Sequence, residues 1–247
     1  MTKNPTDATT DSSALNVLHG PALDEALSRR FTIADETVTV AGRQYVLRKP
    51  ANADHLISEA DYVQDERLPY WADLWPASKQ LATTLLEEDG RGRTLLELGC
   101  GLGLATVAAM DAGFEVTATD YYQDALHVTR GNAARNLGRE PRVRLVDWRQ
   151  WPDDLGLFDT VIAADVIYEV EYSTLVAQCL ARALAPEGEA IIADPGRVAL
   201  AGFFEALPQC GLVLHDLQKI PFHDGDTVRE IQIIRIRHAS PGKVAPE

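Results

Sequence analysis

Glu97-Leu98-Gly99-Cys100-Gly101-Leu102-Gly103 is the stretch of sequence that decides the fold. The run before it, residues 93–98, is apolar and ends at glycine, which predicts a short buried strand. Residues 104–110 follow with helical spacing and stop near Gly113, a residue suited to a helix C-cap. Glycines at alternate positions have no Cβ, so the backbone can turn tightly and a ligand can come close. The next helix would then offer free N–H groups to an anionic group.

A second apolar run, residues 114–120, ends on Asp120 and completes a βαβ unit. A carboxylate at that strand end can accept hydrogen bonds from both ribose hydroxyls of a nucleoside. A dinucleotide site prefers Gly-x-Gly-x-x-Gly, which would require glycine where this chain has Leu104. The glycines at 99, 101 and 103, preceded by Glu97, instead resemble motif I of the class I S-adenosylmethionine-dependent methyltransferases.

Size and composition suit one large α/β domain, since the chain has 247 residues and is 46% hydrophobic. No apolar stretch approaches the roughly 20 residues that span a bilayer, and the N-terminus lacks a basic-then-apolar signal. We therefore expect a cytoplasmic protein with no membrane partner. Cys100, Cys179 and Cys210 are widely spaced and odd in number, which argues against a disulfide framework and a zinc site. The histidines show no ligand spacing either, so no metal is predicted.

The formal net charge of −14 disfavours nucleic acid as a partner, because phosphate neutralisation by lysine and arginine supplies most of that affinity. An acidic surface favours cationic partners, including basic protein surfaces, although it also serves solubility alone. The sequence has no long apolar edge and no heptad pattern. We therefore expect a monomer.

Four segments are expected along the chain. Residues 1–20 are polar with little periodicity and are predicted to form a disordered tail. Residues 21–68 form an N-terminal extension, with a β-hairpin over 37–40 and 43–47 followed by a helix-compatible stretch. The methyltransferase domain is expected over residues 69–238, and residues 239–247 are expected to be a flexible tail.

Strands and helices alternate through the predicted domain, which implies a mainly parallel sheet with helices on both faces. Strands are predicted over residues 94–98, 114–120, 142–146, 158–165, 187–194, 212–220 and 228–237. Helices are predicted over residues 77–88, 103–112, 123–137, 171–184 and 198–208. The last two strands have no helix between them and should pair antiparallel. The resemblance implies a Rossmann-like, seven-stranded sheet that ends in such a hairpin.

The resemblance extends over residues 69–197 and is greatest to the branch of these enzymes that modifies protein lysines. Asp165-x-x-Tyr168 follows the predicted strand 158–165 and matches the Asp-x-x-Tyr signature of that branch. The match implies that Asp165 binds and aims an acceptor amine, and that Tyr168 forms a wall or a hydrogen bond there. Ala164 is expected close to the cofactor, because its small side chain leaves room.

Other candidate cofactor contacts come from two tryptophan-containing segments. In the family a tryptophan before the first helix of the domain lines the cofactor pocket, and Trp75 is the matching position. Trp71 is a further candidate contact on the substrate side; alternatively, Trp71 and Trp75 pack the N-terminal extension onto the core. The resemblance places Trp148 against the adenine, with Asp147 able to accept from its amino group. The alternative is a polar loop in which Trp148 covers the sheet edge.

Three further positions have competing interpretations. Arg197, in Asp194-Pro195-Gly196-Arg197, could contact the substrate or pair with a nearby acid. Asp159 is expected to cap or orient the start of its strand. Asn132 and Asn136 resemble the asparagine-rich helix end of the family, but surface polar groups are the preferred interpretation.

The expected function is methyl transfer from S-adenosylmethionine, in line with the methyl–sulfur bond, to a lysine side chain of a protein. A small-molecule amine or another side chain remains an alternative acceptor. A non-catalytic module that binds S-adenosylmethionine or a protein is a third possibility, which intact Asp165 and Tyr168 argue against. A dinucleotide-dependent oxidoreductase is disfavoured by Leu104.

Overall fold

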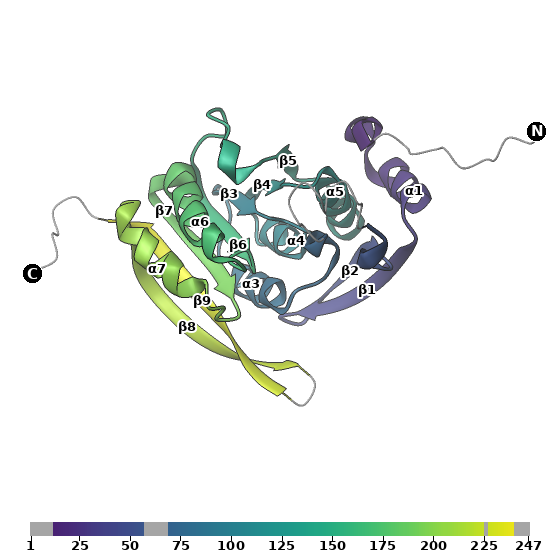
Figure 1. Ribbon diagram of the computed structural model, residues 1–247. Coiled ribbons are helices and arrows are strands. Elements are labelled where there is room, and N and C mark those ends of the chain that lie inside the picture. Colours follow the sequence, from purple (N-terminus) through teal and green to yellow (C-terminus); the bar gives the residue numbers. More distant parts are fainter. Residues whose placement is uncertain (1–11, 57–68, 225–226, 240–247) are drawn as a thin grey trace, which may run out of the picture.

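A computed structural model of the chain describes residues 12–56, 69–224 and 227–239. Its centre is one seven-stranded sheet with the strand order β5-β4-β3-β6-β7-β9-β8 (Figure 1). The strands are β3 (Thr94–Leu98), β4 (Glu115–Asp120), β5 (Arg142–Leu145), β6 (Phe158–Ala164), β7 (Leu184–Asp194), β8 (Leu212–Asp224) and β9 (Thr227–His238). Strands β3 to β7 pair in parallel, whereas β9 pairs antiparallel with both β7 and β8. The predicted fold class is confirmed.

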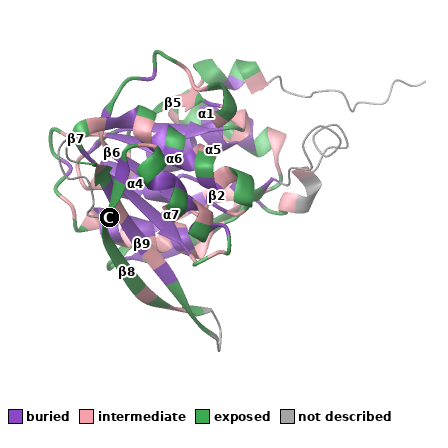
Figure 2. Cartoon of the chain, turned by 60° about the vertical axis from the view of Figure 1, so that its left-hand side comes forward, coloured by how far each residue is buried: buried purple, intermediate pink, exposed green. Residues whose placement is uncertain are grey.

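Helices cover both faces of the sheet, as alternating strands and helices require. They are α3 (Pro76–Leu86), α4 (Leu104–Asp111), α5 (Gln123–Leu137), α6 (Val170–Ala183) and α7 (Leu200–Gln209). Side chains of α6 and α7 pack with Leu96 and Leu98 on one face. Side chains of α3 and α4 pack with Leu95 and Ile162 on the other. Figure 2 shows the central strands largely buried, whereas α6 and α7 expose part of their surface.

The last two strands do not join the sheet in chain order. The final strand β9 lies between β7 and β8, with Asp194 of β7 opposite Gln232 of β9. Residues 227–231 of β9 and their partners on β8 therefore extend past the carboxyl end of β7. The antiparallel pairing predicted for these strands is confirmed, and the hairpin projects from the body of the molecule (Figure 1).

The N-terminal extension packs onto α5 and is ordered earlier in the chain than predicted. Its elements are the 3-10 helix η1 (Ser12–Val17), α1 (Gly20–Arg30), β1 (Ile33–Val40), β2 (Arg43–Pro50) and the 3-10 helix η2 (Ala53–Leu56). The prediction of a disordered tail over residues 1–20 is wrong for 12–20, because Leu15 is 0% exposed and packs beside Val128. Residues 1–11, 57–68 and 240–247 lie outside the described residues. Among the helices that the structure describes, none has the length and apolar character that a membrane crossing requires.

Two asparagines of α5 hold the hairpin of β1 and β2 against the domain. Asn136 accepts from the backbone N–H of Val46 at 2.8 Å and donates to its carbonyl at 2.9 Å. Asn132 does the same for Arg48, at 2.7 and 3.0 Å, and its Nδ2 also lies 2.9 Å from the Leu102 carbonyl in the glycine loop. The two side-chain amides therefore bond the edge of β2 in the way that the backbone of a neighbouring strand would. The surface interpretation of these residues is wrong, since Asn132 is 1% exposed.

Replacing Asn132 with alanine is expected to lower the free energy of unfolding by about 2–4 kcal/mol. The change leaves the buried C=O of Leu102 without its partner, which costs about 1–3 kcal/mol, and the part-buried N–H and C=O of Arg48 lose theirs at a smaller cost because water reaches them. Urea unfolding measures the effect. Asn16→Ala is the control, because its exposed side chain bonds only Gln123 in the described part of the chain. A change below about 0.5 kcal/mol for Asn132→Ala would contradict the assigned role.

Candidate active site

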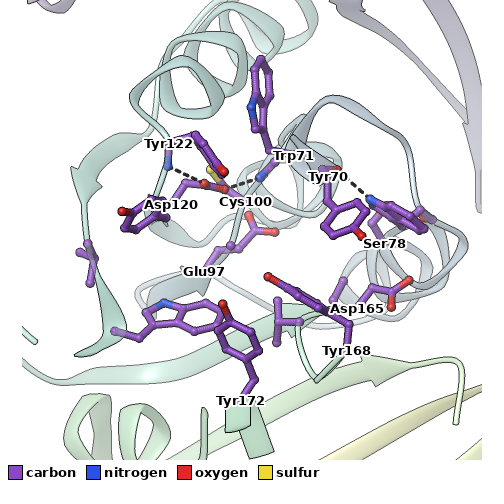
Figure 3. Close-up of a pocket in the computed structure, with 18 of the residues that line it drawn as sticks. Tyr70, Trp71, Ser78, Glu97, Cys100, Asp120, Tyr122, Asp165, Tyr168 and Tyr172 are labelled. Atoms are coloured by element: carbon purple, nitrogen blue, oxygen red, sulfur yellow. Dashed lines mark hydrogen bonds between the residues drawn. The ribbon is translucent and has the colours of Figure 1, made fainter. Parts of the chain in front are cut away.

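A cavity of about 630 Å³ lies at the carboxyl ends of the parallel strands. This volume is in the range of sites for small organic ligands and cofactors. An acidic residue stands at or beside the end of each parallel strand; in spatial order these are Asp147, Asp120, Glu97, Asp165 and Asp194. Figure 3 shows Asp120 and Asp165 on opposite sides of the cavity, with Glu97 between them. Four of these acids, Asp147, Asp120, Glu97 and Asp165, line the cavity, whereas Asp194 is 0% exposed and is not part of the lining.

The glycine loop between β3 and α4 needs its glycines for backbone conformation and for space. Gly101 and Gly103 have φ angles of +52° and +80°, a region that side chains rarely allow. A Cβ at Gly103 would lie 2.8 Å from side-chain atoms of Thr129 on α5, and one at Gly101 would lie 3.2 Å from the Trp71 carbonyl. Thr129 Oγ1 lies 3.0 Å from the Gly101 carbonyl oxygen and 3.3 Å from Cys100 Sγ. Thr129 of α5 therefore holds one side of the loop, and the other side of the loop lines the cavity.

Asp120 is fixed at the end of β4 by two backbone groups. Its Oδ2 accepts from the N–H of Gly101 at 3.0 Å and its Oδ1 from the N–H of Tyr122 at 2.9 Å. A carboxylate has about four lone-pair sites, so Asp120 can accept a further hydrogen bond from a ligand. Burial raises the pKa of Asp120 to about 6, although these backbone donors oppose the rise. Two adjacent acceptors in this place suit a pair of ribose hydroxyls.

Glu97 is 2% exposed and accepts a hydrogen bond from Thr106 Oγ1 on α4. Burial, and to a lesser extent the charge of Asp120, raise its pKa to about 8. Neither carboxylate forms an ion pair with any described residue. A pair of buried acids on one cavity wall fits a ligand that carries positive charge, and S-adenosylmethionine carries both a sulfonium and an ammonium group. The residues present therefore fit this cofactor.

Glu97→Gln is expected to make the free energy of unfolding less dependent on pH. In the wild-type protein the folded state keeps protons on Glu97 and Asp120 at pH values where the unfolded chain has released them. Stability therefore falls as pH rises from about 4 to 8. Glutamine removes the Glu97 contribution, roughly 2–4 kcal/mol between pH 5 and 8, at about 1.4 kcal/mol per pKa unit. Urea unfolding across this range tests it, and parallel curves for the two proteins would contradict it.

The other end of the cavity is lined by the residues proposed to hold adenine. Trp148 packs edge-on against Tyr172 of α6, with ring centroids 6.0 Å apart. Asp147 accepts from the backbone N–H of Arg149 at 3.0 Å, and its oxygens also lie 3.0 Å from Nε and Nη2 of that residue. Asp147 therefore caps a short 3-10 helix, η4 (Trp148–Gln150), in addition to lining the cavity. This local role was not predicted.

Trp71 and Trp75 take different positions, and within the described residues only one of them packs the N-terminal extension onto the core. Trp71, in the 3-10 helix η3 (Tyr70–Ala72), is 8% exposed and packs edge-on against Phe31 at 6.2 Å. Its indole points away from the cavity centre in Figure 3, so it joins the N-terminal extension to the domain. Trp75 precedes α3, and its Nε1 donates to the Tyr70 carbonyl at 2.9 Å. Trp75 lines the cavity.

Asp165 lies directly after β6 and is held in an unusual conformation. Its φ angle is +59°, and its N–H donates to the Ala193 carbonyl of β7 at 2.9 Å. Its side chain is 4% exposed and its Oδ1 lies 2.7 Å from both Nε and Nη2 of Arg197. Burial raises the pKa of Asp165, and the charge of Arg197 opposes the rise. Of the two interpretations of Arg197, pairing with an acid is the one observed.

Three tyrosine rings form a cluster that lines the same cavity as Asp165. Tyr168 lies 5.6 Å from Tyr70 and 4.9 Å from Tyr172, measured between ring centroids. Figure 3 shows these three rings close together at the cavity, and Ala164 is also part of the lining. Tyr70 and Tyr172 were not predicted. Tyr172 lies in the first turn of α6 and Tyr168 before that helix, so no helical spacing in the sequence links the two.

Two other predictions concern support and metal binding. Asp159 Oδ2 accepts from both the N–H and Oγ1 of Thr94 at 2.8 Å, so it fixes the start of β6 against β3, as predicted. Within the described residues, no group of three or more histidine, cysteine, aspartate or glutamate side chains is placed to hold a metal ion.

Comparisons with known proteins agree with this geometry. A family model described as lysine methyltransferase matches residues 64–209. The electron transfer flavoprotein beta subunit lysine methyltransferase of Xenopus laevis is 31% identical over 136 residues, which are 52% of this chain and 53% of the relative. The EEF1A lysine methyltransferase 3 of Mus musculus is 29% identical over 191 residues, 73% of this chain and 76% of the relative. The chain spans about half the length of the flavoprotein-modifying relatives that it matches.

Solved structures share the fold. The N-methyltransferase NodS of Bradyrhizobium japonicum, in complex with S-adenosyl-L-homocysteine, superimposes with a TM-score of 0.55 at 18% identity. The match covers 75% of this chain and 95% of NodS.

Proposed function

The chain belongs to the lysine methyltransferase family of S-adenosylmethionine-dependent enzymes, and from this premise we propose that it methylates a lysine side chain of a protein. The observation that carries the proposal is that Asp165 lines the same cavity as the cluster of Tyr70, Tyr168 and Tyr172. A carboxylate and aromatic rings in one cavity suit an amine, because both attract its cationic form.

We propose that the cofactor lies along the strand ends from β5 to β6. Asp120 would hold the ribose and Trp148 the adenine ring, with Trp75 and Ala164 at the methionine end. Gly99, Cys100, Gly101 and Gly103 would bring the loop backbone close to the ligand, and Glu97 would lie near its positive charge. When bound, S-adenosylmethionine supplies a methyl group that the nitrogen lone pair takes as the carbon–sulfur bonding electrons return to sulfur.

The residues of this chain would position the acceptor and keep water out. Correct positioning alone can contribute roughly 7–11 kcal/mol to lowering a barrier. The amine must also be neutral to attack, which costs about 4–5 kcal/mol at pH 7 for a lysine with a pKa near 10.4. Asp165 would orient the nitrogen through Oδ2 and receive its proton on the way to solvent. Tyr168 would form the wall against which the methylene groups of the side chain pack.

A protein acceptor is favoured over a small amine by the open mouth of the cavity. Tyr70 is 43% exposed there, so the amine of a side chain can enter while the rest of its protein stays outside. We also propose that residues 69–238 form the methyltransferase domain, with residues 21–68 as its extension. The free cysteines Cys100, Cys179 and Cys210 fit a reducing compartment, so we place the enzyme in the cytoplasm.

Labelling of a cell lysate tests the acceptor class. The protein is incubated with a lysate of its source cells and S-adenosylmethionine labelled in the methyl group, and mass spectrometry then locates the label. We expect methylated lysine in a small number of proteins. Label confined to small metabolites would show that the acceptor is a free amine, and label on a different side chain would also overturn the proposal. Heat-denatured protein is the control.

Thermal unfolding tests the cofactor separately. A ligand that binds only the folded state stabilises it by about 2.7 kcal/mol at 100 times its dissociation constant. S-adenosylmethionine and S-adenosylhomocysteine should each raise the unfolding temperature, and NAD should not. A shift with NAD alone would contradict the proposed cofactor site.

A further inference from the structure

Arg197 forms its ion pair with only one of the two carboxylate oxygens of Asp165. Nε and Nη2 of Arg197 both lie 2.7 Å from Oδ1 of Asp165. Among the described residues, none bonds or pairs with Oδ2. Asp165 also lines the cavity. One oxygen is therefore committed to the arginine, and the other remains available to a ligand.

The turn that carries Arg197 is held in place by the buried side chain of Asp194. Asp194, which is 0% exposed, accepts from the N–H of Gly196 at 2.7 Å and from that of Arg197 at 2.9 Å, both through Oδ1. Gly196 has a φ angle of +80°, and a Cβ there would lie 2.9 Å from Nε2 of Gln232 on β9. The side chain of Arg197 is 35% exposed, yet its backbone cannot move without breaking these contacts. The pair is therefore preorganised, unlike two flexible side chains that meet at a surface.

The other ionisable groups around Asp165 are acids or phenols. The end of β7 contributes Asp194, and β9 contributes the neutral Gln232 opposite it. The cavity wall adds Glu97 of β3, Tyr70 of η3 and Asp73, which follows η3. Tyr168 and Glu169, which precede α6, also line the cavity. Arg149, the cation in the cavity lining, is bound to Asp147 beyond β5. Within the described chain, Arg197 is therefore the positive charge closest to Asp165, where the acceptor amine would bind.

We propose that Arg197 is a positioning residue that holds Asp165 through Oδ1, leaves Oδ2 for the acceptor amine, and by its fixed positive charge helps that amine to lose its proton. This inference rests on the proposed function. A carboxylate alone beside an amine favours the charged ammonium, which cannot attack. A guanidinium beside the same carboxylate lowers the proton affinity of the carboxylate and the amine as a coupled pair. The acceptor is then held and aimed, while the neutral form that reacts becomes easier to reach.

The pH dependence of turnover by Arg197→Gln tests the proposal. The acceptor in the assay is the protein that the wild-type enzyme labels most strongly in the lysate. Removing the positive charge should shift the rising limb of the kcat profile to higher pH by about 1 unit or more. Turnover at pH 7 should then fall about tenfold and recover as the pH approaches 10. Arg197→Lys keeps the charge and should keep the wild-type profile within a few tenths of a unit.

Two measurements separate this role from a structural one. The affinity for S-adenosylmethionine, measured by calorimetry, should be unchanged in Arg197→Gln. Arg144→Gln is the matched control, since Arg144 pairs with Asp154 at 2.8 Å on the surface and outside the cavity. It should leave both the pH profile and the cofactor affinity unchanged. Loss of turnover by the same factor at every pH would overturn the proposal.

A titration without acceptor distinguishes failure of this inference from failure of the proposed function. The carboxyl carbon resonance of Asp165, identified by its absence in Asp165→Asn, reports the pKa of that group. Arg197→Gln should raise this pKa by about 1 unit or more, because burial is then no longer opposed by a cation. If the wild-type enzyme labels no protein, the proposed acceptor is wrong, and the titration still tests Arg197. Identical titrations in the two proteins would overturn the inference alone.

Discussion

Asp165→Ala is expected to lower kcat on the protein acceptor by about 100-fold or more, while the affinity for S-adenosylmethionine changes little. The carboxylate is the group proposed to aim the amine and to receive its proton, and contributions of this kind are typically 10²- to 10⁴-fold. Single-turnover kinetics with labelled cofactor measures the loss, and calorimetry measures binding. Full turnover by the variant would show that Asp165 has no part in the reaction.

Asp165→Asn is the better-folded companion variant. Asparagine tolerates the positive φ angle of +59° more readily than alanine does, and its Oδ1 can still accept from Arg197. It removes the charge and retains the shape. A large loss of kcat in both variants would assign the effect to the charge of Asp165. A loss of kcat in Asp165→Ala alone would assign the effect to geometry.

Asp120→Ala is expected to weaken S-adenosylmethionine binding by about 10² to 10⁴-fold. Two hydrogen bonds from ribose hydroxyls to a buried carboxylate are lost, each worth about 1.5–3 kcal/mol because the acceptor is charged. The N–H groups of Gly101 and Tyr122 also lose their partner, so the glycine loop is held less firmly. Calorimetry with S-adenosylmethionine measures the change.

Asp154→Ala is the matched control for that change. Asp154 also pairs with a neighbouring group, Arg144, but its side chain is 73% exposed and lies outside the cavity. Its removal should leave cofactor affinity within about twofold of the wild type, because exposed pairs contribute little. Equal affinities for Asp120→Ala and the wild type would show that the ribose lies elsewhere.

The parts of the site that could be predicted from sequence depend on residues close together in the chain. The glycine loop and Asp120 follow from one βαβ unit, and the Asp165 motif from the strand before it. Alternating apolar and polar segments also gave the strands and helices of the domain, with α5 predicted over the residues that it occupies. Local periodicity is sufficient there because each element buries one face against the sheet.

What the sequence could not provide are contacts between distant segments. Asn132 bonds Arg48, 84 residues earlier, and a polar residue on a helix gives no sign of such a partner. The pairing of Arg197 with Asp165, 32 residues apart, was one of two open interpretations until the strand ends were placed side by side. The ordered turn at residues 12–17 was missed because its one fully buried side chain, Leu15, creates no periodicity. Each case depends on the fold as a whole.

The position of β9 between β7 and β8 has a consequence for shortened versions of this polypeptide. A chain that terminates before residue 227 loses the strand that links β8 to the rest of the sheet, so deletion of one strand detaches two. The backbone of β7 would then be open to pairing with other molecules, a known route to aggregation. Gln232 would also be missing beside Gly196, and the turn that presents Arg197 would lose its neighbour. A stop codon before position 227 should therefore yield an insoluble product rather than a shortened, active enzyme.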